Sequence, residues 1–175
     1  MADAKKYVEN VAGGRKEEYD DLIKKIQKAS KLIRDGGEEQ QGRLDDFTEK
    51  NLEGDIASLI PDQDVQFLSR EVTRYNASIY TLQAQKDQTL EDSTKIDVDM
   101  KARNKGLTIS PEDLHSLKQN LKALEKQLTV DLPRIKRNID ALEAFAGKAL
   151  KNKLNEDNKK SQGKISQMKR NYEDL

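Results

Sequence analysis

The single histidine, His115, follows Glu112 by three positions, and no other pair of residues comes as near to a metal-binding pattern. A Glu-x-x-His pair supplies two ligands from one helix face in di-iron carboxylate bundles, but the complete site needs a second such pair and further carboxylates. One histidine cannot supply both pairs. Glu112 also lies where a helix is expected to begin, and a carboxylate there complements the positive end of the helix dipole. We therefore predict no metal site.

Other short motifs are equally incomplete. Asp97-Val98-Asp99 resembles the start of a calcium loop, but the glycine and the bidentate glutamate that such a loop requires do not follow. Gly13-Gly14 and Gly36-Gly37 lack the Lys-Ser/Thr of a phosphate-binding loop. No strand-turn-helix context presents a nucleophilic serine, and the chain has no cysteine. We predict no catalytic residue and no cofactor, and we expect that the protein is not an enzyme.

Heptad repeats, rather than reactive groups, organise the chain. The first long seam, with alternating spacings of three and four, consists of Val65, Leu68, Val72, Tyr75, Ile79 and Leu82. The second consists of Leu114, Leu117, Leu121, Leu124 and Leu128. Each is the stripe of a helix that faces another helix. The sequence therefore predicts an all-α fold, an elongated helical bundle built on a long antiparallel coiled-coil hairpin.

The hairpin is expected to cover residues 63–153, with its turn at 104–110. Asn104-Lys105-Gly106 predicts a helix end, because glycine adopts the left-handed conformation at little cost. Ser110-Pro111 predicts a helix start, since Ser110 can accept from free backbone N–H groups and Pro111 needs no donor at the first helical position. Two seams joined by so short a loop must fold back on each other.

Residues 1–62 are expected to form N-terminal helices that pack on the hairpin. A third seam, from Tyr19 to Ile33, predicts a helix over about 15–34. Gly13-Gly14 is expected to interrupt the chain before this helix, and Asp35-Gly36-Gly37 is expected to end the helix. The reason is that glycine costs about 1 kcal/mol inside a helix. A second helix is predicted over about 38–60, with a break near Gly54.

Both arms of the predicted hairpin depart from the apolar heptad pattern at about the same height. In the first arm the seam runs through Lys86, Thr89 and Ser93. In the second, a step of four from Leu128 to Leu132 follows another step of four, and Pro133 comes directly after. Such a phase shift locally unwinds a coiled coil, and proline removes a backbone donor. We predict an irregularity near 128–133.

Composition supports a thin, polar, helical protein. Of 175 residues, 37% are charged, 34% hydrophobic and 5% aromatic. These values favour helix pairs over a thick core. The N-terminus lacks the apolar stretch of a signal peptide, and a chain without cysteine suits a reducing compartment. We expect a cytoplasmic protein, with a nuclear location also open.

The charge distribution leaves two alternatives to protein binding. Arg134 to Arg170 contains 11 basic and 4 acidic residues in a chain of zero net charge. A membrane-binding or membrane-curving helical dimer could use this basic face, through Lys148, Lys151, Lys153, Lys159 and Lys160. A nucleic-acid-associated protein is less favoured, because no aromatic residue lies between Phe145 and Tyr172 to stack on bases.

The C-terminal residues 154–175 are expected to hold a polar segment followed by an amphipathic helix. Its apolar stripe consists of Ile165, Met168, Tyr172 and Leu175. An isolated helix of this length is marginal in water, so the stripe needs something to pack against: the protein's own body, a second copy or another protein. We predict a non-enzymatic coiled-coil scaffold or adaptor, a complex subunit that binds a protein partner or forms a homo-oligomer through this stripe.

Overall fold

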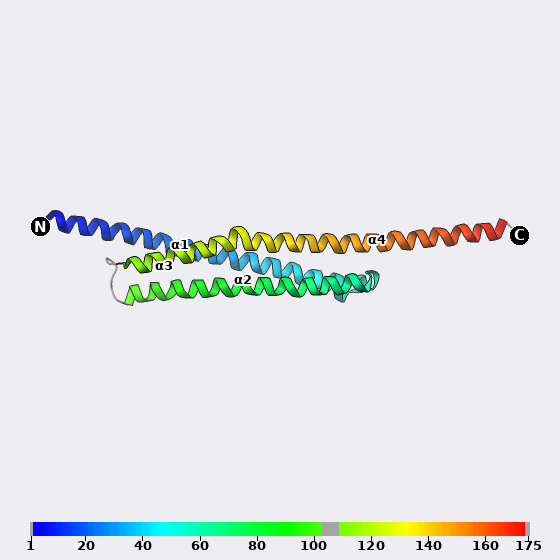
Figure 1. Ribbon diagram of the computed structural model, residues 1–175, viewed down its shortest axis with the longest axis horizontal. Helices are drawn as coiled ribbons and strands as arrows, with labels where there is room; N and C mark the ends of the chain where they lie inside the picture. Colours follow the sequence, from blue (N-terminus) through cyan, green and yellow to red (C-terminus); the bar gives the residue numbers. More distant parts are fainter. Residues whose placement is uncertain (1, 103–108, 174–175) are drawn as a thin grey trace. The chain divides into compact units, whose positions relative to one another are not determined.

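The computed structural model describes residues 2–102 and 109–173, with side chains from residue 15 onward. Its elements, in chain order, are α1 (Ala2–Thr48), the π-helical turn η1 (Glu49–Glu53), the 3-10 turn η2 (Asp55–Leu59), α2 (Asp62–Ala102), α3 (Pro111–Lys126), the π-helical turn η3 (Gln127–Asp131) and α4 (Leu132–Glu173) (Figure 1). The described residues contain no strand, so the all-α prediction is confirmed. Over the same residues, no helix combines the length and the apolar character needed to span a bilayer.

The chain divides into two compact units. Unit 1 comprises Met1–Gln40 and Ser78–Ile135, and unit 2 comprises Gln41–Ala77 and Lys136–Leu175. The helices α1, α2 and α4 each contribute to both units. This grouping differs from the predicted division into 1–62, 63–153 and 154–175, because each unit is built from parts of helices that are far apart in the sequence.

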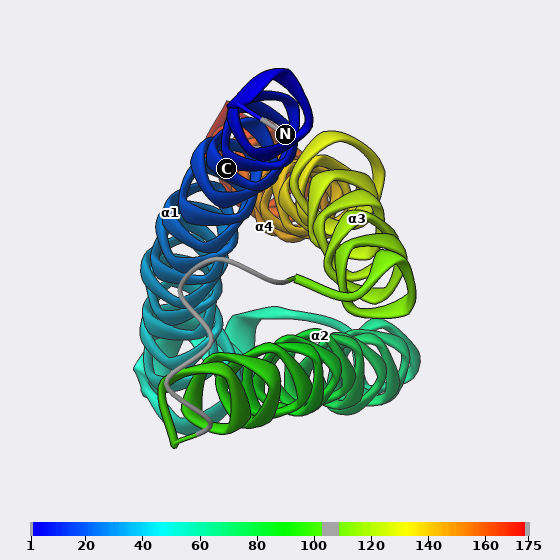
Figure 2. The same cartoon turned by 90° about the vertical axis from the view of Figure 1, so that its left-hand side faces the viewer.

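Unit 1 is a bundle of α1, α2 and α3, which surround a common centre in the end-on view of Figure 2. Its buried apolar side chains are Tyr19, Leu22, Ile26, Ala29, Ile33, Ile79, Leu82, Ile109, Leu114, Leu117, Leu124 and Ile135. The Nδ2 of Asn120 donates to Ser93 Oγ over 2.9 Å, and Gln127 Nε2 donates to the carbonyl of Leu82 over 3.2 Å. Residue numbers rise on one helix as they fall on the other, so α2 runs antiparallel to α3 and η3. The coiled-coil geometry of this pair stays a prediction.

The polar stretch of the first seam is part of the core of unit 1. Lys86 is 6% exposed and Ser93 is 1% exposed, as the heptad spacing predicts. The ammonium of Lys86 reaches the Asp87 carboxylate at 3.0 Å. The seam thus stays on the buried face of α2 through this stretch, although its side chains there are polar and bury little apolar surface.

The predicted irregularity near 128–133 is confirmed as the π turn η3. There the N–H of Leu132 donates to the carbonyl of Gln127, five residues earlier. A π turn inserts one extra residue into a helix, which absorbs the repeated step of four. The chain therefore stays helical up to and through Pro133, whose missing donor would otherwise interrupt a regular ladder.

Two predicted helix interruptions are wrong, because α1 continues through Gly13-Gly14 and through Gly36-Gly37. At the second pair the physical reason is close packing. A Cβ built on Gly36 would lie 2.5 Å from Leu132 Cδ2, and one on Gly37 would collide with the amide of Gln83. These glycines make room for neighbouring helices, and that packing offsets their low helix propensity. The separate helices predicted over 15–34 and 38–60 are therefore one helix as far as Thr48.

Other predicted boundaries fall where expected. Gly54, with φ −91° and ψ −176°, separates η1 from η2, which confirms the break near that residue. The Oγ of Ser110 accepts from the N–H of Asp113 at 3.0 Å, and Pro111 opens α3. The predicted helix end at 104–106 lies outside the described residues.

Unit 2 packs part of α1, part of α2 and most of α4 around a second core. Its buried apolar side chains are Leu44, Phe47, Ile60, Leu68, Val72, Ile139, Leu142, Ala146 and Ala149. Arg43 of α1 donates to Asp140 at 2.6 Å and pairs with Glu143 at 3.0 Å. The rings of Phe67 and Phe145 lie 5.0 Å apart, which joins α2 to α4. These contacts hold α4 firmly in the unit as far as about residue 150.

Candidate functional site

The residues closest to a metal-binding pattern do not form a site. Glu112 and His115 both lie exposed in the first turns of α3. Among the residues whose side chains the structure describes, no three of His, Asp or Glu gather closely enough to hold a metal ion. The Glu112–His115 pair therefore has no further ligand beside it in that part of the chain.

Asp97 has a structural contact that the sequence did not reveal. Its Oδ1 accepts from Tyr19 Oη at 2.6 Å, and its Oδ2 lies 2.9 Å from Lys101 Nζ. Burial opposes ionisation of Asp97, but the hydrogen bonds from Tyr19 and Lys101 outweigh it and hold the pKa of this carboxyl below its usual value. Burial, followed by the bond to Asp97, raises the pKa of Tyr19 well above its usual value. The cluster fastens α1 to α2 within unit 1.

An open groove of about 550 Å³ runs beside this cluster. It is lined by Lys16, Tyr19, Asp20, Ile23, Lys24, Gln27, Asp97, Met100, Lys101 and Ile109. Basic and acidic side chains both line it, and Tyr19 and Lys101 already bond the carboxylate of Asp97 there. Such a groove has no convergent set of groups for acid–base or nucleophilic chemistry.

The lysines predicted to contact an anionic surface lie on α4. Lys148, Lys151, Lys159 and Lys160 are exposed, whereas Lys153 is partly covered and lies 3.9 Å from Asp157. At about 100° per residue, Lys148 and Lys159 point to one side of the helix and Lys153 and Lys160 point roughly 120° away. No flat surface can contact all five at once, so the membrane interpretation gains no shared face from the fold.

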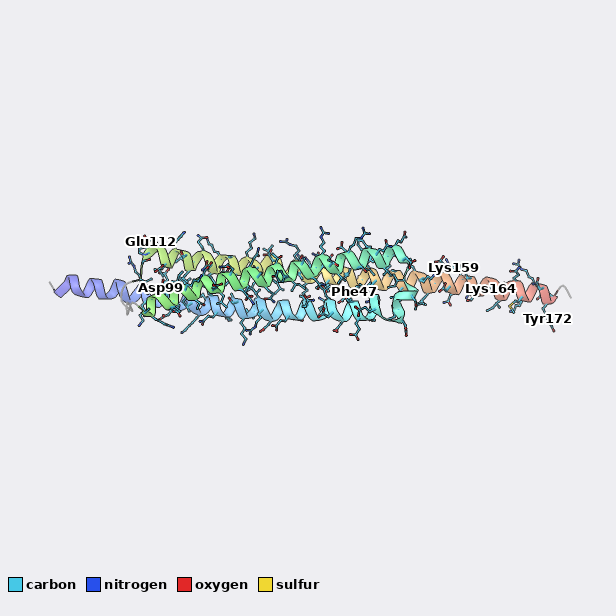
Figure 3. All side chains as sticks on the ribbon, turned by 90° about the horizontal axis from the view of Figure 1, so that it is seen from below. Phe47, Asp99, Glu112, Lys159, Lys164 and Tyr172 are labelled. Carbon is cyan, nitrogen blue, oxygen red and sulfur yellow. The ribbon has the colours of Figure 1, made fainter. Side chains whose placement is uncertain are left out.

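The predicted partner-binding stripe lies on the part of α4 that extends beyond the packed core of unit 2. Every described side chain from residue 158 to residue 173 is exposed. The exposed fractions are 56% for Ile165, 69% for Met168 and 81% for Tyr172, and Leu175 lies outside the described residues. Figure 3 shows Lys159, Lys164 and Tyr172 along this stretch, past the labelled Phe47 of the unit 2 core. We call residues 154–173 the α4 extension.

The chain matches no protein-family model, and no curated protein or solved structure is significantly similar to it.

The apolar stripe of the extension is distinct from the buried face of α4. That buried face, spaced by three and four, continues from Ala149 to Lys153, Glu156 and Lys160, which are all charged. The exposed apolar residues follow a second heptad phase, in which Leu154, Met168 and Leu175 share one position and Ile165 and Tyr172 share the other. The stripe is thus a separate seam, and its continuation does not lead into the core of unit 2.

Leu154 is a member of this seam that sequence reasoning missed. It is 48% exposed and lies fourteen residues, or two heptads, before Met168. The polar residues around it hid the pattern, although heptad spacing counted back from Leu175 would have found it. We define the tail seam as Leu154, Asn158, Ser161, Ile165, Met168, Tyr172 and Leu175.

Single exposed apolar residues occur elsewhere, at Leu32, Tyr80 and Val98 for example. Scattered residues of this kind are normal on protein surfaces. Along the α4 extension, by contrast, exposed apolar side chains recur at heptad spacing. The extension therefore carries an unpartnered apolar face rather than isolated exposed residues.

Proposed function

We propose that this protein is a non-enzymatic coiled-coil structural or adaptor protein, a subunit of a larger assembly that acts through helix–helix contacts. The tail seam is the interaction site. The observation that carries the proposal is the exposure of Ile165, Met168 and Tyr172 at heptad spacing on a helix with no other element beside it in the described structure. A cytoplasmic location belongs to the proposal, because a chain without cysteine suits a reducing compartment.

The energetics of the extension support a partner. The exposed extension gains no stability from packing within the described structure, although packing of an apolar face supplies most of the stability of helices in proteins. Burying a side chain such as Ile165 or Met168 contributes roughly 1.5 to 3 kcal/mol. A partner helix on the tail seam would therefore stabilise the extension and bind at the same time.

The part of α4 that precedes the extension is held by contacts with α1 and α2. Arg43 bonds both Asp140 and Glu143 on α4, and Phe145 packs against Phe67. These contacts come about two and a half to four turns before Leu154. A partner bound to the tail seam would consequently be attached to the folded body of unit 2 through one continuous helix.

A second candidate function is binding to an anionic surface. Between Asn158 and Tyr172 there are five basic residues and no acidic one. This observation favours a phosphate-rich surface over an uncharged one, although the basic side chains are spread around the helix. Binding to a protein partner requires the apolar seam at every salt concentration. Binding to an anionic surface requires the basic side chains instead and is lost as the salt concentration rises.

The test compares a seam variant with a matched control on the same exposed helix. The seam variant carries Ile165→Ser, Met168→Ser and Tyr172→Ser, and the control carries Ser166→Ala and Gln167→Ala, which lie outside the seam. Both should keep the thermal midpoint of the parent within a few degrees, because all five side chains are exposed. Only the seam variant should lose association, measured by light scattering and by cross-linking to proteins of the native cell.

Two results would contradict the proposal. If the seam variant associates as the parent does, the tail seam is not the interaction site. If both variants bind anionic vesicles equally, and this binding is lost by about 200 mM salt, the basic residues carry the function instead.

A further inference from the structure

The core of unit 1 contains a layer to which each helix contributes a polar side chain. Ser30 of α1 is 4% exposed, Lys86 of α2 is 6% exposed and Gln127 of η3 is 5% exposed. Ile26 and Ile33, which flank Ser30 at heptad spacing, are buried apolar residues of the same core. We call Ser30, Lys86 and Gln127 the polar layer.

Hydrogen bonds between α1 and α2 show which residues of these two helices are level. Tyr19 Oη donates to Asp97 at 2.6 Å, and Gln83 Nε2 donates to the carbonyl of Arg34 at 3.1 Å. The two helices are antiparallel, because residue numbers rise along one as they fall along the other. Counting from either contact brings the polar-layer residue of α1 level with that of α2, to within one position.

Gln127 lies at the same level. Asn120 Nδ2 donates to Ser93 Oγ at 2.9 Å, and counting one heptad from this contact brings Gln127 opposite Lys86. Gln127 Nε2 also donates to the carbonyl of Leu82, which lies one turn before Lys86 on the same buried face of α2. The three polar side chains therefore belong to one layer of the core.

The polar layer combines a buried cation with buried acceptor oxygens. The ammonium of Lys86 lies 3.0 Å from the Asp87 carboxylate. Ser30 Oγ and Gln127 Oε1 are buried without a hydrogen-bond partner among the described residues. A buried ammonium group requires oxygen acceptors around it, and apolar surroundings without them are costly. This layer can accommodate Lys86, whereas a purely aliphatic layer cannot.

We propose that the polar layer fixes the alignment of α2 against α1 and α3. Aliphatic heptad seams can pair in several alignments, since a shift by seven residues again brings apolar side chains together. A shift of α2 by one heptad along α1 would bring Lys86 beside Leu22 and Ile26, which are both buried and apolar. A polar residue at a single seam position specifies register in coiled coils at a cost in stability. The device belongs to unit 1 and does not depend on the tail seam.

The test determines the alignment of α1 and α2 by cross-linking, because the chain has no cysteine of its own. Lys16 and Lys101 are exposed and line the same groove, close to the level of Tyr19 and Asp97. A short bismaleimide should join Lys16→Cys and Lys101→Cys within one chain. The matched control chain carries Lys16→Cys and Thr94→Cys. Its second cysteine is exposed but lies one heptad, about 10 Å, away along α2, so it should be joined much less.

The polar layer is then made apolar in both reporter chains by Ser30→Ala, Lys86→Met and Gln127→Leu. The thermal midpoint should stay the same or rise, because apolar side chains of similar volume replace buried polar ones. The yield of the cross-link between positions 16 and 101 should fall at least about twofold, since competing alignments are no longer disfavoured. The lost product should reappear as the cross-link between positions 16 and 94 or as cross-links between two chains.

Lys86→Gln is the control within the polar layer. It keeps a polar group at this position, and that group would be buried without partners if α2 were shifted. The cross-linking pattern of both reporter chains should therefore stay as it is with Lys86. A pattern like that of the apolar layer would mean that polarity at this position does not select the alignment.

Two further results would overturn the proposal. If the apolar layer leaves the cross-linking pattern unchanged, other contacts, such as that of Gly36 with Leu132, fix the alignment without it. If the thermal midpoint falls well below that of the parent, both with the three substitutions and with Lys86→Met alone, the layer stabilises unit 1. It would then not be a device that selects one alignment at a cost in stability.

Discussion

Gly36 of α1 lies against Leu132, the first residue of α4, so closely that a Cβ on the glycine would come within 2.5 Å of Leu132 Cδ2. One residue along, Gly37 makes room for the side chain of Gln83. The amide of Gln83 donates to the carbonyl of Arg34 at 3.1 Å. A glycine pair that resembles a helix end is thus a place where side chains of α2 and α4 pack closely against α1.

Alanine at Gly36 tests this explanation. The substitution gains helix propensity, but Leu132 must move, and overpacking typically costs about 1 to 3 kcal/mol. We expect Gly36→Ala to lower stability by about 1 kcal/mol. Gly42 is the control in the same helix, because a Cβ there meets nothing within 4 Å. Gly42→Ala should raise stability by about 0.5 to 1 kcal/mol in urea unfolding. Equal effects at the two positions would show that the contact with Leu132 is unimportant.

The same comparison shows how far sequence reasoning reaches. Heptad spacing correctly predicted that Tyr19 and Ile33 of α1, and Leu117 and Leu124 of α3, face the core. These are local patterns, which one sequence contains in full. The role of Gly36 depends on Leu132, almost a hundred positions later, and no periodicity within α1 records that distance. Continuity of α1 was missed for this reason.

For the candidate site, the sequence predicted the apolar stripe but did not show that the stripe is separate from the buried face of α4. Ile165, Met168 and Tyr172 are visible from spacing alone. Their exposure in the structure follows from the polar continuation of the buried face of α4, which had to be counted from Ala149 in the folded unit. Leu154 was missed because two seam positions between it and Ile165 are filled by Asn158 and Ser161.

Gln127 should fix how α2 and α3 align. Its side chain is 5% exposed, and its Nε2 donates to the carbonyl of Leu82 and to Gln85 Oε1, both at 3.2 Å. Its Oε1 is buried without a protein partner among the described residues. Gln127→Ala leaves a cavity and should cost about 2 kcal/mol. Gln127→Leu fills the space and removes the unpaired oxygen, so it should be close to neutral in thermal unfolding. A large loss with leucine would mean that the hydrogen bonds, and not the packing, determine stability.

Ser110 should contribute through its cap on α3. Its Oγ accepts from the N–H of Asp113, and loss of such a cap costs typically about 1 kcal/mol. We expect Ser110→Ala to lower the free energy of unfolding by that amount. Ser116→Ala, at an exposed position within α3, should instead be neutral or slightly stabilising, because alanine favours the helix. If both substitutions have the same effect, the cap is not a source of stability.

Acid should weaken unit 1 through Asp97. The folded state lowers the pKa of this carboxyl, so its contribution to stability is complete above the unfolded value, about 3.9, and is lost as pH falls through the folded value. Tyr19 has the opposite sign. Its pKa is raised in the folded state, so its contribution is complete below about pH 10 and is lost as pH rises beyond that. Tyr19→Phe removes a hydrogen bond to a charged acceptor and should cost about 1 to 2 kcal/mol at pH 7.

The decisive measurement is urea unfolding of the parent, Tyr19→Phe and Asp97→Asn between about pH 2 and pH 7. Asp97→Asn should be less stable than the parent at pH 7, and the difference should shrink as the parent's carboxyl becomes protonated. Asp99→Asn, at an exposed neighbour, is the control and should follow the parent throughout. If the difference in stability between Asp97→Asn and the parent stays constant down to pH 2, the charge of Asp97 does not contribute to stability. The loss in Asp97→Asn would then come from altered packing and hydrogen-bond geometry at Tyr19.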